Sequence, residues 1–199
     1  DVVATARNFA WSDDIAPRVV VFRAKGAVAG NPQFDFLIDS YYDGYADMVE
    51  RVSAQFQRQA GRNGRRGLDG VATCNDNFRI SSVRFAAAAD GGPIPPFTAQ
   101  ATAFCELNGA TVADAVAMAS GLGETLGTAN AAVASRSFGG PSTPINGSVQ
   151  MRLYFPSFPE FGAAWDRLNQ TTPTPNPENP ISCHSPSLWG AYLIHQRSN

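Results

Sequence analysis

The chain has 199 residues, a formal net charge of −2 and an apolar fraction of 44%, which suits one large globular domain or two small ones. Charged residues make up only 16%, against about a quarter in typical soluble domains, and this favours an exported protein or a subunit covered by its neighbours. The small net charge gives no reason to expect a nucleic acid or an anionic membrane as partner. No apolar run is long enough to span a bilayer, so no transmembrane segment is expected.

The first 14 residues predict a short or bulged strand, or an arm that packs on a neighbour. Val2, Ala4 and Ala6 alternate, and the phase then slips before Phe9 and Trp11. Two large aromatic side chains are poor residues to leave in water, so we expect Phe9 and Trp11 to lie at an interface. Because the sequence starts at an aspartate without methionine, we expect that a signal peptide was removed and that the protein is periplasmic or secreted.

The rest of the first half predicts a strand, a helix and two strands. Residues 18–25 contain three consecutive valines and are typical of a central strand buried on both faces. A helix is expected to begin between residues 33 and 40. Its apolar positions recur at helical spacing, namely Tyr41, Tyr45, Met48, Val49, Val52 and Phe56. Residues 68–74 and 78–85 then predict two short strands joined by a three-residue turn.

The segment 90–96 (DGGPIPP) is the best candidate for a domain linker, because it is rich in proline and glycine. We therefore expect one domain over residues 1–89, consisting of the arm and a partial unit. A second domain is expected over residues 97–199.

The second half alternates strands and helices. Strands are predicted at residues 98–107, 131–138, 149–155 and 188–196, from apolar residues at a spacing of two. Thr111 and Asp114 predict the start of one helix, which ends near Leu126, and Ser157 caps a second helix. The segment 171–187 contains five prolines and predicts a long loop.

This order of strand, helix, strand, strand, helix, strand predicts an α+β fold with the ferredoxin-like βαββαβ arrangement. The run 151–155 (MRLYF) leading into 161–165 (FGAAW) resembles the dimeric α/β-barrel superfamily. The resemblance implies that two such sheets can pack face to face. Here the first half would supply a related partial unit, giving a pseudo-dimeric barrel within one chain. Many unrelated functions share this fold, so the resemblance assigns no activity.

Three cysteines leave at least one unpaired. Cys105 lies on the apolar face of a predicted strand, which favours a buried thiol. Cys74 and Cys183 lie in a loop or at a strand end, and we expect them to form a disulfide that ties the first half to the long loop.

No cofactor or metal is expected. Cys183-His184 lacks the cysteine at position 180 that covalent haem attachment needs, because Pro180 stands there. A tandem ferredoxin-like pair with a histidine is also similar to haem-dependent peroxidases of the chlorite-dismutase and dye-decolourising types. Those present their histidine from a helix, whereas His184 lies in the proline loop and His195 in a strand. The spacing of the histidines and thiols matches no zinc pattern.

Two charge patterns have both a functional and a structural interpretation. Asp39, Asp43 and Asp47 recur every four residues and indicate the solvated side of a helix rather than a cation site. The arginine cluster could bind an anion or contact a partner, although a solubilising surface loop is favoured. It comprises Arg58, Arg62, Arg65 and Arg66.

The function expected from these features is an exported, non-enzymatic binding or assembly subunit, whose partners are other subunits or further copies of itself. The alternative is a cofactor-independent monooxygenase-like enzyme that holds a small aromatic substrate in a cavity between sheet and helices. The residues that could line that cavity are Tyr154, Trp165, Trp189, Tyr192 and His195. Haem binding is a weaker alternative, and no catalytic residue can be assigned.

Overall fold

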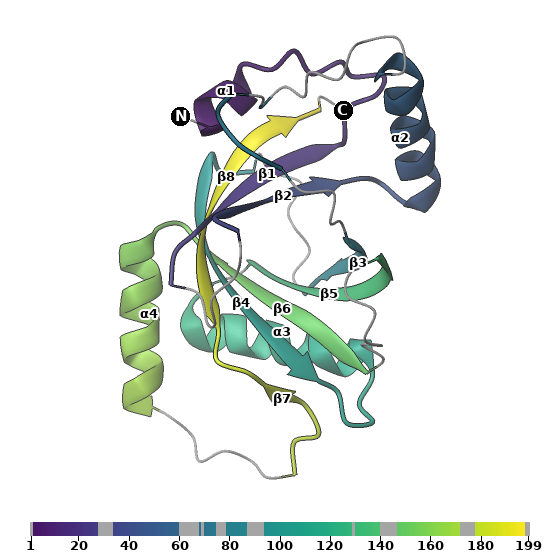
Figure 1. The fold of residues 1–199 in the computed structure, drawn as a ribbon. Coiled ribbons are helices and arrows are strands. Elements are labelled where there is room, and N and C mark those ends of the chain that lie inside the picture. Colours follow the sequence, from purple (N-terminus) through teal and green to yellow (C-terminus); the bar gives the residue numbers. More distant parts are fainter. Residues whose placement is uncertain are drawn as a thin grey trace. The chain divides into compact units, whose positions relative to one another are not determined.

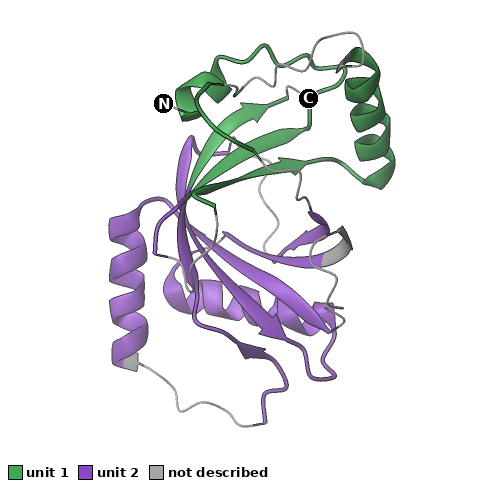
Figure 2. Ribbon diagram, in the orientation of Figure 1, with its two compact units in different colours: residues 1–24, 34–75, 191–199 green, residues 25–33, 76–190 purple. Residues whose placement is uncertain are grey.

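The computed structural model of the chain describes residues 2–27, 34–59, 68, 70–74, 79–86, 94–128, 130–139, 147–171 and 178–197 (Figure 1). The chain forms an α+β structure with antiparallel strand pairs and divides into two compact units (Figure 2). Unit 1 comprises residues 1–24, 34–75 and 191–199, and unit 2 comprises residues 25–33 and 76–190. The units therefore interleave along the chain, whereas composition predicted one boundary between residues 89 and 97. Most of the predicted linker, residues 90–93, lies outside the described residues.

Unit 1 is built around strand β1 (Val19–Lys25), which lies between β2 (Phe36–Tyr41) and β8 (Ser187–Gln196). The β1–β2 pair is antiparallel, with Val20 opposite Ser40 and Phe22 opposite Ile38. Val19, Val20, Phe22 and Arg23 are all buried, so both faces of β1 are covered. This confirms the central strand predicted from the valine run.

The N-terminal strand predicted over the first residues is wrong, because residues 2–7 form helix α1 (Val2–Arg7). A helix of six residues is not stable by itself in water. Ala6 is buried with Val20, Phe22 and Ile194, and Val2 and Val3 pack against the same cluster. This contact with the strands of unit 1 stabilises the helix, and alternation over a few small residues could not reveal it.

The predicted helix starts later than expected, and its first part is a strand. Residues 36–41 pair with β1, and helix α2 (Tyr45–Gln59) begins only after Gly44. The strand predicted at 68–74 is absent from the residues described there, Leu68 and 70–74. Strand β3 (Arg79–Phe85) matches its prediction, but it pairs with β5 (Asn130–Gly139) in unit 2.

Unit 2 contains the elements that the sequence predicted in the second half. They are β4 (Phe97–Glu106), α3 (Val112–Leu126), β5, β6 (Ser148–Phe155), α4 (Phe158–Thr171) and the first residues of β8. The strand order is β8-β4-β6-β5-β3, and the pairs β4–β6, β6–β5 and β5–β3 are antiparallel. The two-residue strand β7 (Ser182–Cys183) adds to β4.

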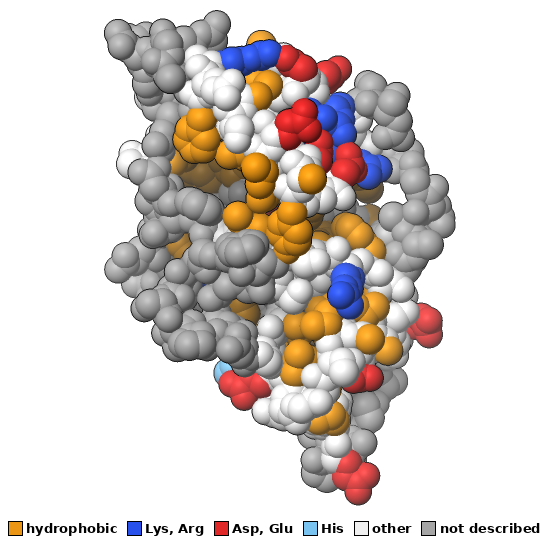
Figure 3. Space-filling view, turned by 90° about the vertical axis from the view of Figure 1, so that its right-hand side faces the viewer, with side chains coloured by type: hydrophobic (Ala, Val, Ile, Leu, Met, Phe, Trp, Pro, Cys, Tyr) orange, Lys and Arg blue, Asp and Glu red, His pale blue; other side chains and the backbone are white. Residues whose placement is uncertain are grey.

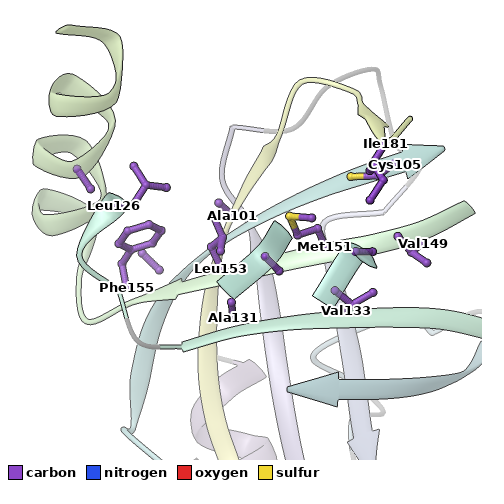
Figure 4. Packing of buried hydrophobic residues seen from close by; sticks show 14 of the residues in the cluster. Ala101, Cys105, Leu126, Ala131, Val133, Val149, Met151, Leu153, Phe155 and Ile181 are labelled. Atoms are coloured by element: carbon purple, nitrogen blue, oxygen red, sulfur yellow. The ribbon is translucent and has the colours of Figure 1, made fainter. Parts of the chain in front are cut away.

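One apolar face of this sheet forms the core of unit 2 (Figure 4). Alternate residues of the strands point to it, and Ala115, Ala119 and Leu126 of α3 and Ala164 of α4 pack against them. Helices α3 and α4 therefore cover the same face. The strand residues of this core are Ala99, Ala101, Cys105, Ala131, Val133, Val149, Met151, Leu153 and Phe155.

Helix α3 has the ends that its sequence predicts. The Thr111 hydroxyl accepts a hydrogen bond from the Asp114 N–H (3.2 Å), and the Asp114 carboxylate accepts one from the Thr111 N–H (2.8 Å). Gly127 adopts the left-handed conformation (φ 71°) at the C-cap. Gly123 is needed for close approach, because a Cβ there would lie 2.7 Å from the Thr128 carbonyl oxygen.

The expected disulfide between Cys74 and Cys183 is wrong, as is the expectation of a free thiol at Cys105. Cys183 bonds Cys105 instead, and Cys74 is a free, exposed cysteine. The reason is the pairing of β7 with β4, which places Cys183 directly opposite Cys105 with 4.0 Å between their Cα atoms. Ile181 is buried in the core of unit 2 beside this bond.

Replacing both bonded cysteines, as in Cys105→Ala with Cys183→Ala, should lower the free energy of unfolding by about 4.5 kcal/mol, because the bond closes a long loop. The sequence separation of the two cysteines is 78 residues. Denaturant unfolding measures the loss, and Cys74→Ser is the matched control with little expected effect. Peptide mapping without reductant that finds Cys183 joined to Cys74 would overturn the assignment.

Candidate functional site

The candidate site is the surface of unit 1, which has two unusual features. The first is helix α2, which is attached to the protein through its polar side. Arg51 Nη1 donates to the carbonyl oxygens of Asp13 (2.8 Å) and Ala16 (3.1 Å). Gln55 Nε2 donates to the Ile15 carbonyl oxygen (2.9 Å). These bonds hold the helix against the segment 12–16.

The apolar side of α2 is exposed. Tyr45, Val49, Val52 and Phe56 share one side of the helix by their spacing, about 110° around the helix axis from Arg51 and Gln55, and Val52 is half-buried. Phe56 is 66% exposed and Val49 is 57% exposed. None of residues 45–58 is buried. Hydrophobic side chains reach the surface in several places on the side of the molecule that carries α2 (Figure 3).

An amphipathic helix normally buries its apolar side, and most of the stability of helices in proteins comes from that packing. In α2 the side chains of Arg51 and Gln55 attach the helix to the protein, while Val49 and Phe56 are exposed to solvent. An exposed apolar surface of this kind is typical of a contact site for another molecule.

The three aspartates at a spacing of four residues do not form a stripe on one helix. Asp39 lies on β2 and pairs with the buried Arg23, with 3.0 Å from Nη2 to Oδ1. Asp43 precedes α2 and accepts hydrogen bonds from Arg18 (2.7 Å) and Arg197 (2.8 Å). Asp47 accepts one from Arg51, and this bond lowers the pKa of Asp47. All three carboxylates are therefore engaged in ion pairs that hold unit 1 together.

Asp39→Asn should destabilise the fold by about 2–4 kcal/mol, since it leaves the charge of Arg23 buried without its counter-ion. The Arg23 side chain is 4% exposed and that of Asp39 is 18% exposed. Asp43→Asn is the matched control. The Asp43 side chain is 43% exposed, so its replacement should cost about 0–1 kcal/mol. Equal losses for the two variants in urea unfolding would contradict this assignment.

The second feature is an apolar pocket of about 140 Å³ in unit 1. Helix α1, the residues after it and strands β1, β2 and β8 all contribute to its walls. The lining residues are Ala6, Phe9, Trp11, Val20, Phe22, Ile38, Leu68 and Ile194. Phe9 is 48% exposed and Ile38 is 44% exposed, whereas Val20 and Phe22 are buried. The pocket therefore has a buried floor and opens to solvent at its rim.

Trp11 forms a fixed wall of this pocket. Its indole N–H donates to the Ala6 carbonyl oxygen (3.3 Å). The Trp11 ring lies nearly parallel to the His195 ring and edge to face with the Phe9 ring. The ring centroids are 5.1 Å apart in each pair. Burial lowers the pKa of His195, while Asp13 opposes the shift and Arg197 reinforces it. His195 Nε2 is buried and has no hydrogen-bond partner within the described part of the chain.

Stability should fall as the pH is lowered from about 7 to 5, because the unfolded chain binds a proton on His195 more readily than the folded chain does. Unfolding therefore takes up a proton below the ordinary pKa of 6.5. Thermal unfolding of the wild type and of His195→Gln over this range is the test, and the variant should show a weaker dependence on pH. Asp14, Asp47 and Asp114 have pKa values lowered from 3.8, so they titrate below this range. Parallel pH profiles for the two proteins would contradict the prediction.

The residues predicted from the sequence fall in different places. Phe9 and Trp11, the predicted interface pair, both line the pocket. Of the five predicted cavity residues, Tyr192 and His195 belong to unit 1, and Tyr154, Trp165 and Trp189 belong to unit 2. None of the five lines the pocket. Trp165 stacks on Phe161 (5.3 Å) beside the core of unit 2, and Trp189 is buried.

Of the predicted arginine cluster, Arg58 pairs with Asp14 and so helps to hold α2. Arg62, Arg65 and Arg66 lie outside the described residues. His184 is exposed, and its backbone N–H donates to the Phe104 carbonyl oxygen (2.8 Å). The remaining pocket residues were missed by sequence reasoning, because they are ordinary apolar residues spread over the whole chain.

The residues that the structure describes contain no group of three or more His, Cys, Asp or Glu side chains that could hold a metal ion. No helix among them is long and apolar enough to cross a membrane. Comparison with protein-family models, curated proteins and solved structures finds no match to this chain.

Proposed function

We propose that this protein is an exported, non-enzymatic binding or assembly subunit that contacts other protein subunits, or further copies of itself, through α2. The observation that carries the proposal is the exposure of Tyr45, Val49 and Phe56 on a helix that polar side chains attach to the protein. Burying Val49 and Phe56 against a partner would remove apolar surface from water, at about 25 cal/mol per Å². Aromatic residues are frequent anchors at the centre of protein interfaces.

Export to the periplasm or the outside of the cell is supported by two features. Cys105 and Cys183 are bonded, and disulfides persist mainly in oxidising compartments. The low fraction of charged residues, 16%, points in the same direction. The removal of a signal peptide remains a prediction.

We also propose that unit 2 is ferredoxin-like. The support is its element order from β4 to β8 and its strand order β8-β4-β6-β5, with α3 and α4 on one face. The packing of two sheets as a pseudo-dimeric barrel stays a prediction, which a crystal structure would test.

A monooxygenase-like or haem-dependent activity has less support. The lining of the unit 1 pocket offers no acid, base or metal ligand among the described residues. Its chemistry therefore suits binding rather than catalysis.

The assembly proposal predicts that Val49→Glu with Phe56→Glu separates the protein from its partner without harming its fold. Two charges on an exposed side should change the free energy of unfolding by less than about 0.5 kcal/mol, whereas at an interface they would be buried unpaired. Native mass spectrometry of the protein isolated from its source measures the assembly, and thermal unfolding measures the fold.

Gln57→Glu is the control, because it adds a charge at an exposed position next to Phe56 and should leave the assembly intact. A wild-type protein that is monomeric at all concentrations would overturn the proposal. So would a double variant that is strongly destabilised, since its apolar side would then be covered within the chain itself.

A further inference from the structure

The pocket of unit 1 is lined by no residue of α2, and it has the size, the walls and the opening of a ligand site. We propose that it binds a neutral monocyclic aromatic molecule of about six to eight non-hydrogen atoms. This inference does not rest on the assembly function, because it concerns a different surface and a different kind of ligand.

The volume limits the ligand to one ring. The pocket encloses about 140 Å³, close to the roughly 150 Å³ of an engineered apolar cavity in another protein that stays dry and binds benzene. Pockets for drug-sized molecules are larger, at about 300–1,000 Å³. A fused two-ring molecule would therefore have to displace the walls or leave its second ring in solvent at the open rim.

The walls favour an aromatic ligand. Phe9, Trp11 and Phe22 contribute three rings, and aromatic pairs prefer edge-to-face or offset contacts at ring distances of about 4.5–7 Å. Two of the rings are held in place before any ligand binds. Trp11 is fixed by its hydrogen bond to Ala6 and by the His195 ring, and Phe22 stacks on Phe36 at 4.7 Å. Pre-organised walls lower the entropic cost of binding.

The lining also excludes charged ligands. None of the eight lining side chains is charged, and the indole N–H of Trp11 already donates to Ala6. A carboxylate or an ammonium group in the pocket would lose its hydration without gaining a partner. The ligand must therefore be neutral in the part that enters.

A ligand can reach the pocket without unfolding of the core. Phe9 and Ile38 at the rim are nearly half exposed, while Val20, Phe22 and Ile194 form a buried floor. A water molecule in this pocket would be poorly stabilised, because an ordered water needs two to four polar partners. An apolar ring would gain contact with every wall.

The test is a titration of the full chain with toluene, followed by NMR of the methyl groups of Ile38, Ile194 and Val20. We expect saturable shifts of these methyls, confined to residues that line the pocket. Ala6→Leu places a larger side chain in the pocket and should weaken toluene binding by about tenfold or more. Ala4→Leu is the matched control, because Ala4 is exposed on the same helix and does not line the pocket; it should bind like the wild type.

If Ala6→Leu fails to fold, comparing the binding of several ligands to the wild-type protein still tests the proposal. Toluene should bind more tightly than naphthalene, which is too large, and than benzoate, which is charged. Absence of saturable shifts with toluene would overturn the proposal. Equal binding of toluene to the wild type and to a folded Ala6→Leu variant, or tighter binding of naphthalene or benzoate, would do the same.

Discussion

The structure of unit 2 depends on one constraint, which is that alternate residues of neighbouring antiparallel strands must face the same apolar layer. In β4, β6 and β5 every second residue points toward α3 and α4, and Met151 and Phe155 are typical of this set. A shift of one residue in the pairing would move the whole set to the other face. The same register also extends to β7, where it places Cys183 opposite Cys105 and allows the disulfide to form.

Unit 1 is stabilised by a different combination of interactions. Its small core consists of residues from α1, β1 and β8, and hydrogen bonds and an ion pair join α2 to the segment 12–16. Exposed ion pairs contribute little stability, whereas the pair of Arg23 and Asp39 is largely buried and matters more. The polar attachment explains how α2 can present Val49 and Phe56 to solvent.

The two surfaces of unit 1 suit different partners. The exposed residues of α2, from Tyr45 to Phe56, extend over about three turns, which fits the proposed contact with another protein. The pocket beside Trp11 is small, concave and uncharged, so it suits a single ring.

The sequence by itself determined most of unit 2, because its strands and helices carry regular apolar spacing and Thr111 and Asp114 specify a helix start that depends only on neighbouring residues. It also indicated Phe9 and Trp11 as a notable pair, since large aromatic side chains rarely stay in water. Only the tertiary structure decided that residues 2–7 form a helix, that 36–41 form a strand, and that Cys183 bonds Cys105. The tertiary structure also determined the orientation of α2, and it brought Ala6, Phe22 and Ile194 together in one pocket. The physical reason is that local spacing reports which side of an element is apolar, whereas contacts between residues far apart in the chain determine whether that side is buried.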